Sequence, residues 1–182
     1  MRLDKFTLKA QEALQASQQV AERFGNQQIE PEHLMRAILE QKEGVIPPLL
    51  GKIGANQAQL VEAFEAAIDK LPKVSGASTG QLYISPRTKN VLDKAFEEAE
   101  QMKDEYVSLE HILLAVTEEK EGDAARILAE AGITRDTILK ALVDIRGGQR
   151  ITDQNPEDKY QALERFSKDL SGLAAKENWI RS

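Results

Sequence analysis

Apolar residues recur at three- and four-residue steps through most of the chain, which is the spacing of one face of an α-helix. The first such run extends from about Asp4 to Phe24 and ends at Gly25-Asn26, a pair that favours a helix stop. Its apolar face consists of Phe6, Ala10, Ala13, Leu14, Ser17, Val20, Ala21 and Phe24. The pattern predicts one long amphipathic helix at the start of the chain.

Further helical segments follow, each with a start or stop signal. Pro31, Asn56 and Ser85-Pro86 mark starts, because proline suits the first helical turn and Asn or Ser can cap it. Gly54 and Gly132 mark ends. We expect no strand, and helices over 30–41, 47–53, 56–71, 86–103, 108–120, 123–131 and 134–146.

The order of these segments repeats along the chain. The motif at 29–34 (Ile-Glu-Pro-Glu-His-Leu) matches the motif at 107–112 (Val-Ser-Leu-Glu-His-Ile) at an offset of 78 positions. The match continues without a gap over more than sixty positions. Such self-similarity indicates a tandem duplication and fixes the architecture. We therefore predict an all-α domain over residues 1–146, built from two four-helix repeats at about 4–72 and 83–146.

Three segments fall outside the repeats. Residues 74–81 are rich in Gly and Ser and predict a flexible connector between the repeats, and residues 147–157 are polar and predict a flexible linker. Residues 158–176 return to a helical pattern within a C-terminal segment, 158–182. Their apolar stripe is Leu163, Phe166, Leu170 and Leu173. Either this stripe packs back on the repeats or it belongs to an interface absent from this chain; the polar linker favours the second interpretation.

Composition narrows the range of functions. The chain has 182 residues, with 24 basic and 30 acidic side chains and a net charge of −6, which argues against a general binder of nucleic acid or anionic membranes. There is no cysteine, so thiol chemistry and cysteine-ligated zinc are excluded. No apolar run reaches membrane-spanning length, and the charged start, Met1 to Phe6, does not resemble a secretory signal. We expect a cytoplasmic protein.

Two histidines are the only residues that suggest chemistry. Glu32-His33 and Glu110-His111 occupy equivalent repeat positions, each at the start of an apolar helix. They could form a Glu/His dyad or a metal site, but metal-ligand spacings such as His-x-x-x-His are missing. A glutamate at a helix start also complements the helix dipole, so the structural role is favoured. Gly51-Lys52-Ile53 fails the phosphate-loop pattern. We expect no enzyme activity, cofactor or metal.

A duplicated helical unit can form a groove where its two halves meet, and such clefts bind ligands or peptides. The first helices of the repeats are candidates to line this groove. Their candidate residues are Thr7, Leu14, Leu92 and Phe96. The alternative is that Leu14, Leu92 and Phe96 belong to the core.

Several motifs resemble the N-terminal domain of Clp AAA+ chaperones. They are the start, Met-Arg-Leu-Asp-Lys-Phe-Thr at 1–7, the paired Glu-His motifs, and Ala-Gly-Ile-Thr at 131–134. Residues 146–170 resemble the segment that joins this domain to the first ATPase module in the ClpB-type disaggregase branch. Residues 176–182 depart from the family pattern. We therefore expect 158–182 to lead toward an ATPase domain that this chain lacks.

This resemblance implies two repeats related by a pseudo-twofold axis and a groove that engages unfolded or aggregated polypeptides for delivery to the AAA+ ring. Carried over by position, the groove residues are Thr7, Leu92, Asp104 and Glu110, with Glu32 as the repeat equivalent of Glu110 and His111 at the groove edge. In the related ClpC branch the matching acidic positions resemble receptors for cationic or phosphoarginine-bearing clients.

The implied partners are unfolded polypeptides, the remainder of a ClpB-type hexamer and, at the level of the full machine, the DnaK chaperone system. Two alternatives without direct client binding stay open. One is an assembly module driven by the stripe on 158–176. The other is an adaptor that docks on a chaperone ring.

Overall fold

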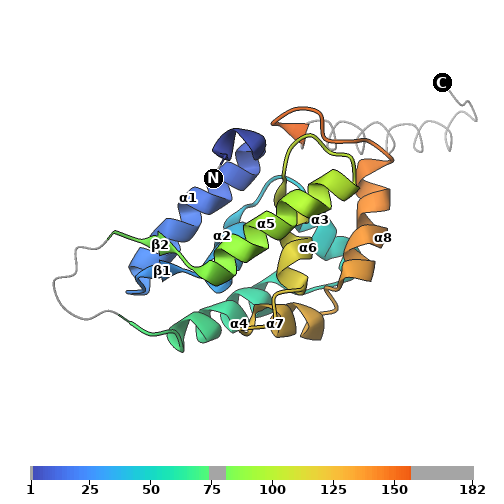
Figure 1. The fold of residues 1–182 in the computed structure, drawn as a ribbon. Coiled ribbons are helices and arrows are strands. Elements are labelled where there is room, and N and C mark those ends of the chain that lie inside the picture. Colours follow the sequence, from blue (N-terminus) through green and yellow to red (C-terminus); the bar gives the residue numbers. More distant parts are fainter. Residues whose placement is uncertain (1, 74–80, 157–182) are drawn as a thin grey trace, which may run out of the picture.

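The computed structural model describes residues 2–73 and 81–156. The first repeat contains a 3₁₀ turn η1 (Leu3–Lys5) and helices α1 (Leu8–Arg23), α2 (Pro31–Glu40), α3 (Ile46–Ile53) and α4 (Gln57–Asp69). The second contains α5 (Pro86–Gln101), α6 (Leu109–Thr117), α7 (Ala124–Glu130) and α8 (Arg135–Arg146). Figure 1 shows these elements, and the predicted all-α tandem repeat is confirmed. In the described part of the chain, no helix is long and apolar enough to cross a membrane.

Equivalent caps begin the first helix of each repeat. The Thr7 hydroxyl accepts a hydrogen bond from the Ala10 amide at 3.2 Å, and the Ser85 hydroxyl accepts one from the Thr88 amide at 3.1 Å. Such caps satisfy backbone donors that the first turn leaves free. The first helix therefore starts after Thr7, not at Asp4 as the apolar spacing predicts, because Phe6 belongs to the extended residues before the cap.

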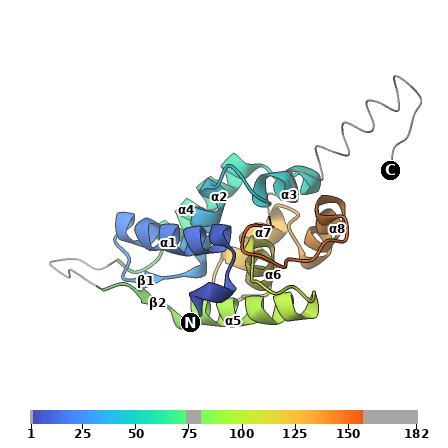
Figure 2. The ribbon, with the colours of Figure 1, turned by 90° about the horizontal axis from the view of Figure 1, so that it is seen from above.

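Short parallel pairings join the two repeats. Strands β1 (Gln28–Ile29) and β2 (Tyr83–Ile84) pair with Ile29 opposite Ile84, and an isolated bridge pairs Phe6 with Val107. A shift of 78 positions turns one pairing into the other with the repeats exchanged, which is the pseudo-twofold relation. Figures 1 and 2 show β1 beside β2. The expectation of no strand is wrong here, because two-residue strands are too short to produce a period of two in the sequence.

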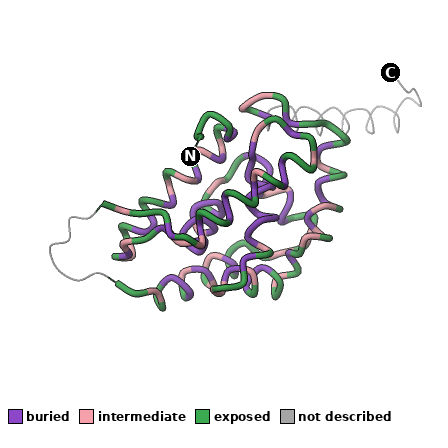
Figure 3. The backbone as a smooth tube through the Cα atoms, in the orientation of Figure 1, coloured by how far each residue is buried: buried purple, intermediate pink, exposed green. Residues whose placement is uncertain are grey.

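The core is shared between the repeats and is centred on α2 and α6. Every residue of α6 from Leu109 to Val116 is buried, and α2 contacts α5, α6 and α7 of the second repeat as well as α1 and α4 of its own. One cluster of buried apolar side chains contains members from both repeats. Figure 3 shows this buried interior. Neither repeat covers its central helix alone, so the two fold as one unit.

The chain after α8 crosses the domain instead of leaving it. Ile151 is wholly buried and belongs to the main core cluster, and Pro156 is also buried. Figure 2 shows this segment, in orange-red, passing from α8 toward the start of α1. The sequence predicts a flexible linker at 147–157, whereas residues 149–156 lie against the repeats. The predicted helix at 158–176 and all but the last residue of the connector at 74–81 lie outside the described residues.

Candidate functional site

An open recess runs along α5, beside the N-terminal turn η1. It consists of two adjoining hollows of about 460 and 470 Å³ that share Arg2 and Phe96. The first hollow is also lined by Lys5, Ala99, Glu100, Asp104, Glu105 and Val107. The second is also lined by Ile84, Lys89 and Asp93. We call these two hollows together the α5 recess; Figure 2 shows η1 lying beside α5.

Of the four apolar residues that line the α5 recess, Phe96 and Ile84 are not buried, and we call these two its apolar floor. Phe96 is half-buried and its ring meets that of Phe6 edge to face, with centroids 5.2 Å apart and planes at 73°. Phe6 is completely buried, and its backbone pairs with Val107. Ile84 is 42% exposed. A partly exposed aromatic ring and an exposed aliphatic side chain thus lie in one recess, backed by buried residues, as a binding site requires.

Large apolar side chains that are exposed are few and unevenly distributed along the described residues. Among the described residues, five large apolar side chains are exposed, and four of them lie in the N-terminal segment or in β2. These four are Leu3, Leu8, Tyr83 and Ile84. Of these four, only Ile84 lines the α5 recess. Single exposed apolar residues are ordinary, so Ile84 matters because it lies beside Phe96 in the same hollow.

Of the four groove residues predicted on the first helices of the repeats, only Phe96 lines the α5 recess. Thr7 is buried as the cap of α1, and Leu92 is buried in the main core cluster. Leu14 is half-buried and packs against that cluster. Leu92 is therefore a core residue, which is the alternative that the sequence left open for it.

Asp104, Glu110 and His111 do come together, but inside the domain. The Asp104 carboxylate accepts from Arg146 Nη1 at 3.0 Å and from the Ile151 amide at 2.9 Å, and lies 2.7 Å from His111 Nε2. Burial alone would raise its pKa, yet the hydrogen bonds from His111, Arg146 and the Ile151 amide lower the pKa of Asp104 to about 2. The carboxylate is thus charged at neutral pH and internally paired.

Glu110 is equally enclosed. Its side chain has no exposed area, one oxygen accepts from the Ser108 hydroxyl, and the other lies 4.0 Å from Arg146 Nη1. An acidic rim facing solvent at Asp104 and Glu110 is therefore not what the structure shows, although Asp104 contributes to the wall of the α5 recess. The carboxylates on the exposed edge of that recess are Asp93, Glu100 and Glu105.

The two histidines serve as helix caps. His33 Nδ1 accepts from the Glu30 amide at 2.8 Å, and His111 Nδ1 accepts from the Ser108 amide at 2.9 Å. His33 Nε2 lies 2.9 Å from Asn26 Oδ1, which assigns its proton to Nε2. Burial lowers the pKa of His33 to about 4. Both rings have the structural role that the sequence favours, and within 2–73 and 81–156 no cluster of three potential metal ligands is found.

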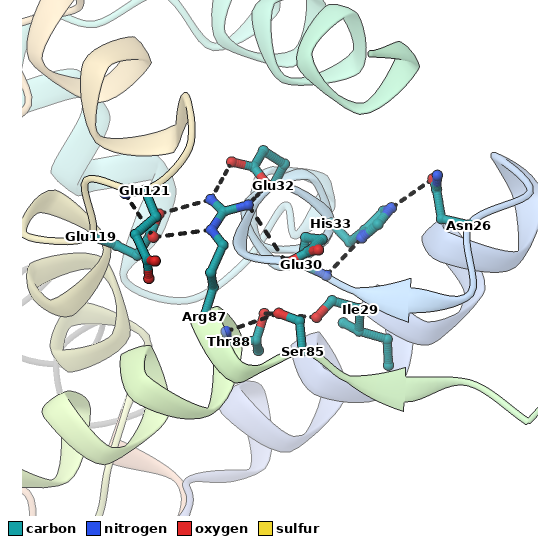
Figure 4. Close-up of polar contacts among 10 residues, drawn as sticks. All are labelled: Asn26, Ile29, Glu30, Glu32, His33, Ser85, Arg87, Thr88, Glu119 and Glu121. Atoms are coloured by element: carbon teal, nitrogen blue, oxygen red, sulfur yellow. Dashed lines mark hydrogen bonds and ion pairs between the residues drawn. The ribbon is translucent and has the colours of Figure 1, made fainter. Parts of the chain in front are cut away.

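Glu32 belongs to a buried ion-pair cluster, shown in Figure 4, that joins the repeats. Arg87 at the start of α5 contacts Glu32 Oε2 at 2.8 Å and Oε1 at 3.2 Å. The same guanidinium contacts Glu119 Oε2 at 3.0 Å and Oε1 at 2.8 Å. Although burial opposes the charged form, these hydrogen bonds and charges raise the pKa of Arg87 and lower that of Glu119. Glu32 is thus occupied by the chain's own arginine.

The sequence did not single out Arg2, Ile84, Arg87 or Glu119. Ile84 is exposed, whereas its repeat equivalent, Phe6, is buried. Phe6 packs on the aromatic ring of Phe96, but the residue of the first repeat that corresponds to Phe96 is Gln18, which offers Ile84 no such ring. A comparison of the repeats position by position would have marked this asymmetry. Arg87 carries a weaker signal, since a basic residue in a first helical turn is unfavourable unless a carboxylate pairs with it.

Comparison with known protein families identifies the class of domain to which this fold belongs. The model of the Clp repeat N-terminal domain matches residues 5–131. The chain therefore belongs to the Clp repeat N-terminal domain family.

Within this family, the sequence is similar to ClpB chaperones. It is 43% identical over 179 residues to chaperone protein ClpB of Nitratidesulfovibrio vulgaris, covering 97% of this chain and 21% of that protein. It is 39% identical over 172 residues to ClpB of Bacillus cereus, covering 93% and 20%. The chain spans about a fifth of the length of the curated relatives it matches.

Solved structures agree with this assignment. The Hsp104 N-terminal domain from Candida albicans superimposes with a TM-score of 0.72 at 26% identity, covering 84% of this chain and 99% of that one. The N-terminal domain of ClpD from Arabidopsis thaliana superimposes with a TM-score of 0.59 at 23% identity, covering 79% and 98%, and shows the fold alone. The domain is thus of the kind found in ClpB and Hsp104 chaperones.

Proposed function

We propose that this chain is the substrate-recognition module of a protein disaggregase and that the α5 recess binds exposed apolar segments of unfolded or aggregated proteins. The observation that supports this most directly is that Phe96 and Ile84, neither of which is buried, line the same hollow. Burial of a client's apolar side chain against this floor removes both surfaces from water.

The edge of the recess suits clients of varied sequence. Residues of both charges line it: Arg2, Lys5 and Lys89 are basic, and Asp93, Glu100 and Glu105 are acidic. Lys89 and Asp93 form an exposed ion pair with each other, and such pairs are weak enough to exchange for a client's charge. Both hollows are open to solvent. We expect weak, fast-exchanging binding of extended segments, with specificity for apolar character and not for one sequence.

Delivery to an ATPase ring belongs to the same proposal at the level of the whole protein. The relatives are about five times longer than this chain, and their name identifies them as chaperones. The remainder of the hexamer and the DnaK system stay expected partners of that larger machine.

A single substitution tests the recess. Ile84→Ser removes most of an exposed apolar side chain from the floor, and we expect it to weaken binding of a permanently unfolded protein about fivefold, which corresponds to about 1 kcal/mol. The measurement is fluorescence anisotropy with a reduced, carboxymethylated and labelled client. Val143→Ser on α8 is the matched control, because Val143 is 69% exposed and does not line the recess.

Equal affinities for Ile84→Ser, Val143→Ser and the unsubstituted chain would contradict the assignment of the recess. Absence of any binding by the unsubstituted chain would contradict the client-binding function itself and favour an adaptor or assembly role.

A further inference from the structure

We propose that residues 149–156 form a latch that holds the two walls of the α5 recess together, and that client binding and latch docking strengthen each other. This inference rests on the proposed function of the recess. It assigns Ile151 and Gln154, which lie outside the recess, as positioning residues for it.

The first end of the latch holds the loop after α5. The Ile151 amide donates to Asp104 Oδ1 at 2.9 Å, and the Glu105 amide donates to the Ile151 carbonyl at 2.8 Å. The Ile151 side chain is wholly buried in the main core cluster. Asp104 and Glu105 form one wall of the recess, so this end of the latch fixes that wall from behind.

The second end holds the N-terminal segment. The Gln154 side-chain amide donates to the carbonyls of Asp4 at 3.1 Å and Phe6 at 3.3 Å. The Leu8 amide donates to the Gln154 carbonyl at 2.8 Å. Arg2 and Lys5 of this segment form the other wall of the recess. Gln154 therefore fixes the opposite wall.

The two walls also touch each other directly, through the Thr7 amide on the Val107 carbonyl at 2.9 Å and the Val107 amide on the Lys5 carbonyl at 2.8 Å. The latch adds a second connection that spans the same two segments. With the latch undocked, η1 is held to the domain through fewer contacts, and the recess is less well preorganised for binding.

The coupling has to be reciprocal. If undocking of the latch weakens client binding by some factor, client binding must favour docking by the same factor.

The test uses the whole chain and measures both the effect of the client on latch docking and the effect of the latch on client affinity. Three backbone amides report latch docking, because each donates a hydrogen bond that exists only when the latch is docked: Leu8, Glu105 and Ile151. Hydrogen exchange of these amides is followed with and without a saturating, permanently unfolded protein. Client affinity is then measured for Ile151→Ala and Gln154→Ala, with Thr152→Ala, an exposed position in the same segment, as the control.

We expect the client to slow exchange of the three latch amides at least threefold. We also expect Ile151→Ala and Gln154→Ala to weaken binding about three- to tenfold, while Thr152→Ala binds like the unsubstituted chain. Protected amides in α6 show whether each variant is folded. Should Ile151→Ala disrupt the core, Gln154→Ala still decides, because Gln154 is only partly buried and its side chain reaches carbonyls at the edge of the domain.

Because the coupling is reciprocal, client binding without any change at the latch amides, or unchanged affinity in Gln154→Ala, would overturn it and leave the proposed function intact. Equal weakening by Thr152→Ala would also overturn it. Absence of client binding by the unsubstituted chain would overturn both.

Discussion

Replacement of Arg87 by methionine tests the claim that a buried ion-pair cluster joins the two repeats. Methionine keeps much of the side-chain volume but leaves Glu32 and Glu119 without their shared partner. Those carboxylates have only 2% and 6% of their side-chain area exposed, and Arg87 has 17%. A carboxylate left charged and unpaired at such burial is strongly destabilising.

The size of the effect follows from this burial. Loss of one partner from a buried ion pair typically costs about 3–5 kcal/mol, and the partly exposed edge of Arg87 lets some water reach the carboxylates. We therefore expect a loss of about 3 kcal/mol in the free energy of unfolding at pH 7. For a domain of this length that corresponds to a fall of about 6–12 °C in Tm.

Urea unfolding followed by far-UV circular dichroism measures the loss. Lys89→Met is the matched control, since it removes the same charge from the same helix at an exposed ion pair with Asp93. Exposed pairs contribute about 0–1 kcal/mol, so the control should change stability by less than that. A loss for Arg87→Met no larger than for Lys89→Met would refute the claim.

Two further predictions concern the neighbourhood of Arg87 and the response to acid. A Cβ atom on Gly122 would lie 2.1 Å from Arg87 Nη2, so Gly122→Ala should displace the guanidinium and destabilise the fold by about 1–3 kcal/mol. Gly51 in α3 has open space around it, so Gly51→Ala should stabilise the fold by about 0.5–1 kcal/mol. Thermal melts compare the two variants, and a shift of Tm in the same direction for both would contradict the packing at Arg87. Because the folded-state pKa of His33 is about 4 and its ordinary value is 6.5, the unfolded chain takes up the proton first, and His33 should account for a loss of about 2 kcal/mol in unfolding free energy between pH 7 and pH 5. Urea titrations at both pH values should show this loss reduced in His33→Gln, and an unchanged pH dependence would contradict a neutral, capping His33.

The local structure could be predicted well because its signals are local. Caps and stops such as Asn56, Ser85 and Gly54 depend on a few neighbouring residues, and helices α2 to α8 begin and end within a few residues of the prediction. The duplication is also visible in one sequence, since an ungapped offset needs no structure to detect.

The site was harder to predict because it depends on contacts between distant residues. Glu32 and Glu110 are equivalent in sequence, yet Glu32 binds Arg87 of the other repeat whereas Glu110 faces Ser108 and Arg146. Nothing local distinguishes a carboxylate on an exposed rim from one paired inside. The residues after α8 show the same limit, because Ile151 is one apolar residue in a polar stretch and its burial depends on a core formed by both repeats.

The most direct test of client binding at the α5 recess is a residue-by-residue NMR titration of the whole chain with a permanently unfolded protein. We predict that the largest shifts fall on the residues that line the recess, centred on Ile84, Phe96 and Glu105, and that they decrease in Ile84→Ser. Shifts confined to another surface, such as the hollow between α4 and α7 lined by Ala63 and Ile127, would contradict the account.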